Sequence, residues 1–306
     1  MTYSKTMISV LIPVYNYNIC DLVNTLHKQL SASKIEFEII CIDDYSNKST
    51  INSNETINTL SNTSYSLSDK NNGIAVTRQL LVNKAKYDWV LLIDADMKLK
   101  DAFFISNYLK AIKQNYEVVF GGIIYDTNPP DLSSLLRWKY GVTYESVSAE
   151  KRNKTPYKIT SAANMLIKKE VYIKFALDSI GNSYGMDIYF GPQLKLNKIP
   201  VLHIDNSVYH LGLESSIKYK EKVEFAVRTL LNLYNKKEIQ EHDNDLLKAF
   251  VVSKKTGLNF IFFGLYVAFN KLIVNNLLSK NPKIILIQYY KILYMCYFDL
   301  CKNKTN

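Results

Sequence analysis

Trp89-Val-Leu-Leu-Ile-Asp-Ala-Asp96 decides how this sequence folds. Five apolar residues run consecutively from Trp89 to Ile93, and carboxylates at Asp94 and Asp96 follow them. A continuous apolar run that ends in polar residues is typical of a strand buried on both faces, as in a parallel sheet. The stretch therefore predicts a central strand with two carboxylates at its carboxyl end.

Further apolar runs and helical patterns surround this strand. Ile19, Val23, Leu26 and Leu30 recur at the spacing of an amphipathic helix, and a similar period appears twice later. We expect strands at residues 8–12, 37–42, 89–93 and 118–124, and helices at 19–30, 74–85 and 103–112. This alternation predicts an α/β fold with a Rossmann-like, doubly wound and mostly parallel sheet.

The pattern changes near Gly212. Residues 213–235, 246–278 and 284–300 have helical patterns without intervening strands. The chain of 306 residues is long enough for one large domain with an appendage. We therefore expect a catalytic domain in residues 1–212 and a helical C-terminal extension in residues 213–306.

The composition is that of a globular protein with an anionic partner. Hydrophobic residues make up 47% of the chain, charged residues make up 22%, and the net charge is +10. Basic residues are spread along the chain without a nucleic-acid-binding signature, so we expect a nucleotide or an anionic lipid as partner and no nucleic acid. The 4 cysteines form no CxxC pair, and the N-terminus has no signal-peptide pattern, which together favour a cytoplasmic setting.

Three of the expected strands end in polar or turn-forming residues, at Pro13 to Asn16, at Asp43-Asp44 and at Asp94 to Asp96. Ligands of open α/β sheets bind beyond the carboxyl ends of the strands. A nucleotide diphosphate that leaves carries negative charge, which Mg²⁺ or Mn²⁺ neutralises, and both ions prefer oxygen ligands. The last pair therefore predicts a metal–nucleotide site, in which one carboxylate binds the metal and the other orients on the ribose or on a metal-bound water.

Two further motifs each have a structural and a functional interpretation. Asp43-Asp44 either forms a strand-end turn that caps the next segment, or accepts from a base N–H or a ribose hydroxyl. In Asn72-Gly73 the glycine permits a tight turn and the asparagine caps the following helix. Arg78, inside that helix, either reaches a phosphate or lies on the exposed surface.

Four segments, in this order, resemble family 2 glycosyltransferases: Ile8 to Asn16, Ile40 to Ser46, Asn71 to Arg78 and Leu91 to Asp96. Further on, Asn164 to Glu170 is similar to the family's strand and turn near the acceptor side. The resemblance extends over about residues 7–212, and four motifs in order are far more specific than any one of them.

The resemblance implies a GT-A fold and inversion at the anomeric carbon. It implies a UDP-, GDP- or dTDP-sugar donor, of which UDP is favoured, and a Mn²⁺ or Mg²⁺ ion bound by Asp96. It also implies that Pro13, Tyr15 and Asp44 hold the nucleoside. We place four further residues with them at the donor site: Asn72, Gly73, Arg78 and Asp94.

The family's general base lies late in the catalytic domain, usually in an acidic pair ahead of an apolar helix. The matching segment, Tyr184 to Gly191, has a single acid, because Met186 stands where the family often has Glu. Asp187 is therefore the candidate base for the acceptor hydroxyl, with a helix cap as the alternative. His210 matches a metal-ligating histidine of some GT-A enzymes, with a structural role as the alternative, and His203 fits a core or supporting position.

The Gln-x-x-Arg-Trp element of processive synthases is missing after Asp187, although Arg137-Trp138 occurs before it. We therefore expect inverting, non-processive, metal-dependent transfer of a sugar to a hydroxyl of a bacterial-type surface glycan or lipid-linked acceptor. A sugar nucleotidyltransferase would normally carry a glycine-rich, basic N-terminal loop, which Ile12 to Tyr17 lacks. A catalytically inactive binding protein would be expected to lose the metal carboxylates; both are present, but Met186 keeps this alternative open.

The C-terminal region also has two interpretations. Its longest uninterrupted apolar stretch, Phe260 to Phe269, is shorter than the ~18–20 residues that span a bilayer. The helices either pack on the catalytic domain or bind peripherally to the inner face of the cytoplasmic membrane through lysines and aromatic rings. For the second case we expect five aromatic residues at the lipid interface: Phe260, Phe262, Phe263, Tyr289 and Tyr290.

Overall fold

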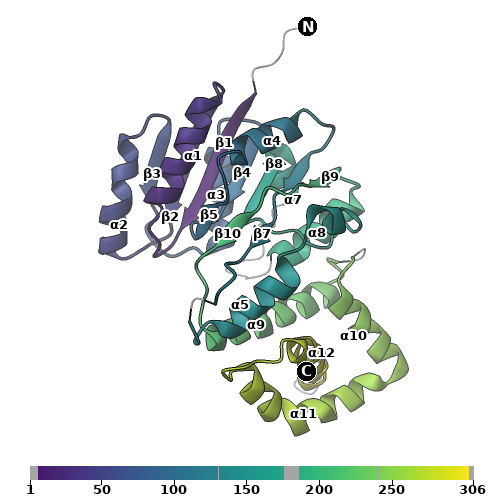
Figure 1. The fold of residues 1–306 in the computed structure, drawn as a ribbon. Helices are drawn as coiled ribbons and strands as arrows, with labels where there is room; N and C mark the ends of the chain where they lie inside the picture. Colours follow the sequence, from purple (N-terminus) through teal and green to yellow (C-terminus); the bar gives the residue numbers. More distant parts are fainter. Residues whose placement is uncertain (1–5, 130, 176–185, 240–241, 303–306) are drawn as a thin grey trace. The chain divides into compact units, whose positions relative to one another are not determined.

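The structure is a computed structural model that describes residues 6–129, 131–175, 186–239 and 242–302 (Figure 1). The chain forms two compact units, and each is built from two stretches of sequence. Unit 1 comprises Met1–Ile124 and Val147–Gly212, and unit 2 comprises Tyr125–Ser146 and Leu213–Asn306. Tyr125–Ser146, which the sequence pattern assigns to the first domain, thus belongs with the C-terminal helices.

A mixed seven-stranded sheet forms the centre of unit 1, in the order β3-β2-β1-β4-β8-β6-β9. Its strands are β1 (Met7–Val14), β2 (Glu36–Asp43), β3 (Thr63–Leu67), β4 (Trp89–Ile93), β6 (Val118–Phe120), β8 (Asn164–Lys168) and β9 (Val201–His203). Strand β8 runs antiparallel to both β4 and β6, and the other neighbouring strands pair in parallel. The predicted doubly wound and mostly parallel sheet is confirmed.

Helices cover both faces of this sheet. Helices α1 (Cys20–Ala32) and α4 (Phe104–Ile112) pack in one apolar cluster, and α3 (Ile74–Lys84), α7 (Lys169–Phe175) and α8 (Met186–Leu196) pack in the other. Val10 and Ile12 of β1 belong to the first cluster and Leu11 to the second, because successive side chains of a strand point to opposite faces. The shorter elements of unit 1 are α2 (Lys48–Asn54), η1 (Glu55–Thr59) and α6 (Ala149–Asn153).

A small second sheet combines β5 (Met97–Leu99), β10 (Val208–His210) and β7 (Ile123–Ile124). The single strand expected at 118–124 is therefore wrong, because the run divides at Gly121-Gly122 into β6 of one sheet and β7 of the other. Gly122 has φ +89°, and a Cβ at Gly121 would lie 2.6 Å from the carbonyl oxygen of Asn206. Both glycines are needed for the chain to pass between the sheets.

Unit 2 is helical in its described part. It contains α5 (Leu135–Tyr140), η2 (Gly141–Glu145), α9 (Ser216–Asn235), α10 (Asp245–Thr256), α11 (Leu258–Leu277) and α12 (Ile285–Lys302). Buried Arg137 joins its two stretches of sequence, because the guanidinium bonds Glu145 and lies over the rings of Tyr125 and Tyr219. The helical stretch expected at 246–278 is divided by Gly257, whose φ of +76° ends α10 in a left-handed turn.

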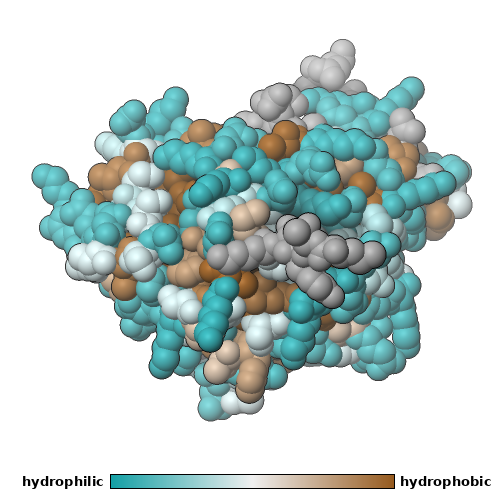
Figure 2. Space-filling model, turned by 90° about the horizontal axis from the view of Figure 1, so that it is seen from above, coloured by the Kyte–Doolittle hydropathy of each residue, from teal (hydrophilic) through white to brown (hydrophobic). Residues whose placement is uncertain are grey.

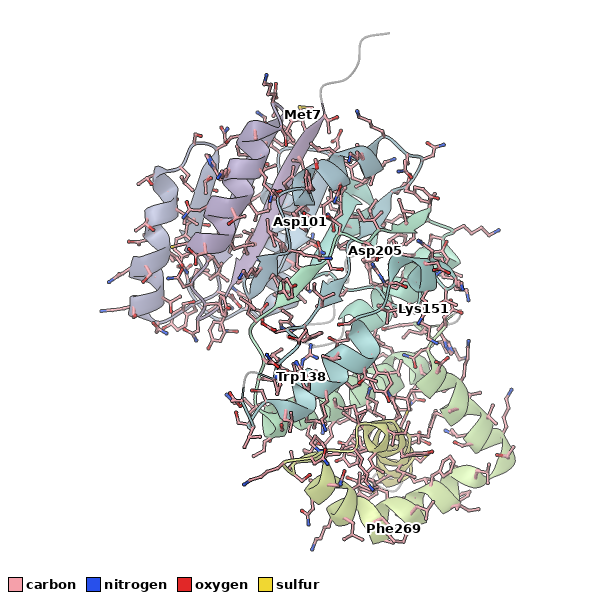
Figure 3. All side chains as sticks on the ribbon, viewed as in Figure 1. Met7, Asp101, Trp138, Lys151, Asp205 and Phe269 are labelled. Carbon is pink, nitrogen blue, oxygen red and sulfur yellow. The ribbon has the colours of Figure 1, made fainter. Side chains whose placement is uncertain are left out.

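The face of the molecule drawn in Figure 2 is mainly hydrophilic, and its hydrophobic side chains gather in smaller areas. Scattered exposed apolar residues are normal on soluble proteins, so these areas alone indicate no function. The side chains of both units are drawn on the ribbon in Figure 3.

Candidate active site

The carboxyl ends of β1, β2 and β4 lie at one edge of the sheet, because β1 pairs in parallel with both neighbours (Figure 1). Pro13 is buried at the end of β1, whereas the side chain of Tyr15 is 55% exposed. The backbone N–H of Asn16 donates to Ser46 Oγ over 2.7 Å, and Asn16 Oδ1 accepts from the N–H of Asn47 over 2.9 Å. These bonds hold the loops after β1 and β2 together.

Sequence reasoning missed Tyr45, which follows Asp44 in the β2 loop. Its side chain is 61% exposed, and its φ of 74° lies in the left-handed region that non-glycine residues rarely adopt. Tyr15 and Tyr45 are thus two exposed phenol rings on adjacent strand ends. Aromatic rings of this kind stack on nucleobases, and the signal that could have found Tyr45 is its place directly after the double aspartate.

Asp43 and Asp44 have separate tasks. Asp43 is fully buried; its carboxylate accepts from the hydroxyl of Tyr65 over 2.5 Å and from the N–H of Ser46 over 2.7 Å. This confirms the strand-end-turn interpretation for Asp43. Asp44 accepts from the N–H groups of Asn72 at 2.8 Å and of Gly73 at 2.7 Å, so it fixes the loop that leads into α3.

The expected capping role of Asn72 is wrong. The N-cap residue of α3 is Gly73, with φ +83°, and no side chain caps the helix. The side-chain amide of Asn72 instead donates to Asp44 Oδ1 and to the carbonyl oxygen of Lys70. The expected tight turn at Gly73 is confirmed, because this φ is open to glycine and strained for other residues.

Arg78 of α3 and Asp94, which directly follows β4, form an ion pair. Arg78 Nη2 lies 2.6 Å from Asp94 Oδ1, and only 7% of the arginine is exposed. The interpretation of Arg78 as a surface residue is therefore wrong. The Asp94 carboxylate is thus directed toward the guanidinium of Arg78 in α3. Asp96, the second carboxylate of the motif, has a different environment.

Asp96 meets His210 across the small sheet. Strand β10 runs antiparallel to β5 so that His210 pairs with Met97, and His210 Nε2 lies 3.1 Å from Asp96 Oδ2. The N–H of Leu211 donates to the carbonyl oxygen of Asp96 over 2.9 Å. A Cβ at Gly212 would lie 2.7 Å from Asp96 Cβ and closer still to its carboxylate, so this position needs glycine for lack of space.

Tyr17 is a second residue that sequence reasoning missed. It is half-buried, and desolvation together with the negative charge of Asp96 raises the pKa of its hydroxyl. The phenol is therefore protonated at neutral pH, and it lies within electrostatic range of the Asp96 carboxylate. Its signal in the sequence is its place at the end of the β1 motif, beyond Pro13, Tyr15 and Asn16.

The donor atoms at Asp96 and His210 suit a divalent cation that also binds phosphate. In the described part of the chain no three His, Cys, Asp or Glu side chains are grouped as a complete metal site. Mg²⁺ typically takes one or two carboxylates and completes its shell with water and substrate phosphates, and Mn²⁺ accepts imidazole as well. A carboxylate beside an imidazole at a sheet edge therefore fits an ion that is held jointly by protein and nucleotide.

Two remaining predicted residues lie elsewhere in unit 1. Asp187 is the second residue of α8, and its side chain lies outside the described part of the structure. His203 is 2% exposed and stacks on Phe120; its Nδ1 lies 2.9 Å from Arg152 Nη1. Burial, with Arg152 adding repulsion, lowers the pKa of His203 to about 4, so the core interpretation of this histidine is confirmed.

The fold is a GT-A-like α/β sheet, and the polar motifs at the ends of β1, β2 and β4 lie at its carboxyl edge. Residues 9–175 match the profile of the family described as "Glycosyl transferase family 2". Since the match covers more than half of the chain, this protein belongs to glycosyltransferase family 2 and is a glycosyltransferase. The comparison with curated proteins gives no match.

Solved structures of S. aureus TarS have a similar fold. A structure of TarS 1–349 aligns with a TM-score of 0.51 and 15% identity over 97% of this chain and 92% of that one. A second structure, TarS 1–349 in complex with UDP-GlcNAc, gives a TM-score of 0.51 and 14% identity with the same coverage. Against a longer TarS chain the TM-score is 0.50 at 19% identity, and this protein spans 40% of that chain. At these identities the likeness shows the fold.

Proposed function

We propose that this enzyme transfers a single sugar from a UDP-sugar to a hydroxyl of a glycan or lipid-linked acceptor, with inversion and with the help of a divalent cation. The observation that carries the proposal is the pair of Asp96 and His210, 3.1 Å apart at the carboxyl edge of the sheet. The complex of TarS 1–349 with UDP-GlcNAc, a protein of similar fold, supports a UDP-sugar as donor.

Asp96 and His210 would hold the cation together with the diphosphate oxygens. When bound, the cation supplies a positive charge that stabilises the departing nucleotide diphosphate. Gly212 keeps space for the Asp96 carboxylate, and burial together with the charge of this carboxylate raises the pKa of the Tyr17 hydroxyl. His210 ends strand β10, and Asp96 directly precedes β5, which pairs with β10; this pairing gives the two ligands a fixed geometry.

The nucleoside half of the donor would lie at the ends of β1 and β2. Tyr15 and Tyr45 present exposed rings there, and buried Pro13 fixes the path of the β1 loop. Asp44 fixes the loop before α3, because its carboxylate accepts from the N–H groups of Asn72 and Gly73. The carboxylate oxygens have further lone pairs that could accept hydrogen bonds from a base or a ribose. Arg78 acts as a positioning residue for Asp94, whose second carboxylate oxygen would orient the ribose.

The base of the reaction is Asp187 in this proposal. The acceptor oxygen forms a bond to the anomeric carbon on the face opposite the leaving group, while the bond from that carbon to the diphosphate oxygen breaks. The acceptor proton passes to the Asp187 carboxylate, and the electron pair of the broken bond leaves with the nucleotide. Attack from the opposite face inverts the anomeric configuration.

Single transfer is supported by the missing processive element. Arg137, in the upstream Arg137-Trp138 pair, is enclosed by Tyr125, Glu145 and Tyr219 of unit 2. The sugar nucleotidyltransferase alternative is excluded by the family match, and the paired Asp96 and His210 speak against an inactive binding protein.

The test is a thermal-shift and calorimetric screen of UDP-sugars with and without Mn²⁺. A true donor raises the melting temperature by mass action, and the rise should need Mn²⁺. Asp96→Ala and His210→Ala should each lose the Mn²⁺-dependent part and keep metal-free UDP binding. Asp88→Ala, an exposed aspartate before the amino end of the same strand β4, is the matched control and should behave as the wild type. Unchanged Mn²⁺-dependent binding in Asp96→Ala would refute the metal assignment.

A further inference from the structure

One face of helix α11 is apolar and uncovered. Seven large apolar side chains of α11 are exposed: Leu258, Phe260, Ile261, Leu265, Val267, Phe269 and Leu272. Phe260 is 66% exposed and Leu272 is 65% exposed, and Figure 3 shows Phe269 on the same helix. Leu258, Ile261, Leu265, Phe269 and Leu272 recur at helical spacing and form a stripe along one side of α11. Phe260 and Val267 lie at the border of the exposed half of the helix, more than about a third of a turn from this stripe.

The opposite side of α11 packs inside unit 2. Tyr266 stacks on Tyr297 with ring centroids 4.5 Å apart, and Phe263 stacks on the same tyrosine at 5.6 Å. The aromatic residues expected at a lipid interface therefore divide: Phe262 and Phe263 are half-buried and Tyr290 is buried, whereas Phe260 and Tyr289 are exposed. Since the core of unit 2 lies on the inner side, the exposed stripe is not needed for this unit's own packing.

Basic residues surround the stripe. Residues 246–302 contain eight lysines and a single acid, Asp299, whose carboxylate lies 3.0 Å from Lys254. Lys254 and Lys255 precede α11 directly, exposed Lys271 lies within it, and Lys280 and Lys283 follow it. An apolar face with cations at both ends complements an anionic lipid surface, where phosphates meet the lysines and acyl chains meet the stripe.

We propose that α11 lies flat in the surface of an anionic lipid bilayer and anchors the enzyme there. A second copy of this chain fits the stripe less well than an anionic bilayer does. Two copies of α11 packed face to face would bring like charges together in either direction, because both ends of the helix are basic. The proposal concerns unit 2 alone and does not depend on the assignment of the active site.

A flat position fits α11 better than a membrane-spanning one. In the described part of the chain α11 is the one helix long and apolar enough to cross a bilayer by length and composition. However, its inner face bears Tyr266 and buried Asn259 and packs on α12, where the hydroxyl of Tyr290 bonds Glu224. A spanning helix would carry these polar groups into the hydrocarbon, whereas a flat helix leaves them in the protein.

The first test is flotation of the full chain with vesicles of phosphatidylcholine and phosphatidylglycerol, against vesicles of phosphatidylcholine alone. Each large apolar side chain that enters the acyl region contributes about a tenfold factor to partition, so Ile261→Ser with Leu272→Ser, both in the stripe, should lower binding about a hundredfold. Phe103→Ser with Leu132→Ser is the matched control, because these side chains are 65% and 62% exposed and belong to segments other than α11. The control pair should bind as the wild type, and circular dichroism confirms folding of both.

The second test addresses charge. Lys255, Lys271 and Lys283 changed to Gln should lower binding to the anionic vesicles by about fivefold for each lysine, and added salt should lower it further. Three exposed lysines of unit 1, Lys28, Lys110 and Lys113, changed to Gln serve as the control and should have a smaller effect. Asp96→Ala should float as the wild type, which separates anchoring from catalysis.

Three outcomes would overturn the proposal. The first is no flotation of the wild type with anionic vesicles. The second is flotation that resists carbonate and high salt, which would mean that α11 spans the bilayer. The third is a wild type that is dimeric in solution and becomes monomeric with Ile261→Ser and Leu272→Ser without a change in flotation, which would assign the stripe to a second copy.

Discussion

Gly212→Ala tests whether the space beside Asp96 matters for function. A Cβ at residue 212 would lie 2.7 Å from Asp96 Cβ, whereas ordinary contacts begin at 3.4 Å. The difference of about 0.7 Å is the least displacement that Asp96 or the chain after β10 must accept. Since the φ of Gly212 lies outside the left-handed region, alanine is otherwise allowed there, and the effect reports the clash.

We expect Gly212→Ala to lower kcat/KM by about tenfold to a hundredfold, because sub-ångström displacement of a group that holds the reacting phosphate is costly. Overpacking should lower the free energy of unfolding by about 1–3 kcal/mol. Gly264→Ala is the matched control: nothing lies within 4 Å of its added Cβ in the middle of α11. That variant should gain about 0.5–1 kcal/mol, as alanine usually does in a helix.

The assays are steady-state transfer with a UDP-sugar, calorimetric Mn²⁺-dependent donor binding and urea unfolding. In an Asp96→Ala background, Gly212→Ala should cause no further loss of metal-dependent binding, since the affected carboxylate is already absent. If Gly212→Ala keeps kcat/KM and donor affinity within about twofold of the wild type, the site tolerates the displacement and the reasoning is refuted.

Three further predictions concern separate residues. Asp187→Asn should keep donor binding and lower kcat by about two to four orders of magnitude, and near-normal turnover would place the base elsewhere. Arg78→Met should lower the free energy of unfolding by about 2 kcal/mol, because Asp94 loses its partly buried partner; adding Asp94→Asn should restore part of this loss in urea unfolding. NMR titration should find His203 neutral down to about pH 4. Because the pKa of His203 is lower in the folded than in the unfolded protein, its contribution to the free energy of unfolding is complete above about pH 6.5, and up to about 3 kcal/mol of it is lost as the pH falls to 4. A His203 that titrates near pH 6.5 would contradict the last prediction.

Much of unit 1 follows from local sequence patterns. The apolar run from Trp89 to Ile93 predicted β4 correctly, because a strand buried on both faces is apolar at every position and can be recognised from its own residues. The strand β3 was missed, since Thr63–Leu67 lies at the sheet edge and has mixed polarity. Its pairing with β2 is a property of the assembled sheet rather than of its own residues.

The partners within the site were harder to predict than the residues. Asp94, Asp96 and Arg78 were all identified from spacing, but the division of the two carboxylates between Arg78 and His210 depends on contacts across the fold. The wrong assignment of Asn72 as a cap has the same origin. The backbone N–H groups before α3 donate to the carboxylate of Asp44, which is distant in sequence, rather than to the side chain of Asn72.

The chain passes into unit 2 twice, and this has a consequence for how the protein is made. Leu136, in the first stretch of unit 2, is fully buried and packs in a cluster with Tyr219, Ile287 and Tyr290 of the second stretch. On the ribosome, residues 125–146 emerge long before these partners, so the apolar face of α5 stays uncovered until residues 219–290 have been synthesised. Deletion of the C-terminal helices would leave that face uncovered permanently. A chain that ends before residue 213 therefore exposes the apolar face of α5, and a nascent chain stalled there should be a target for chaperones.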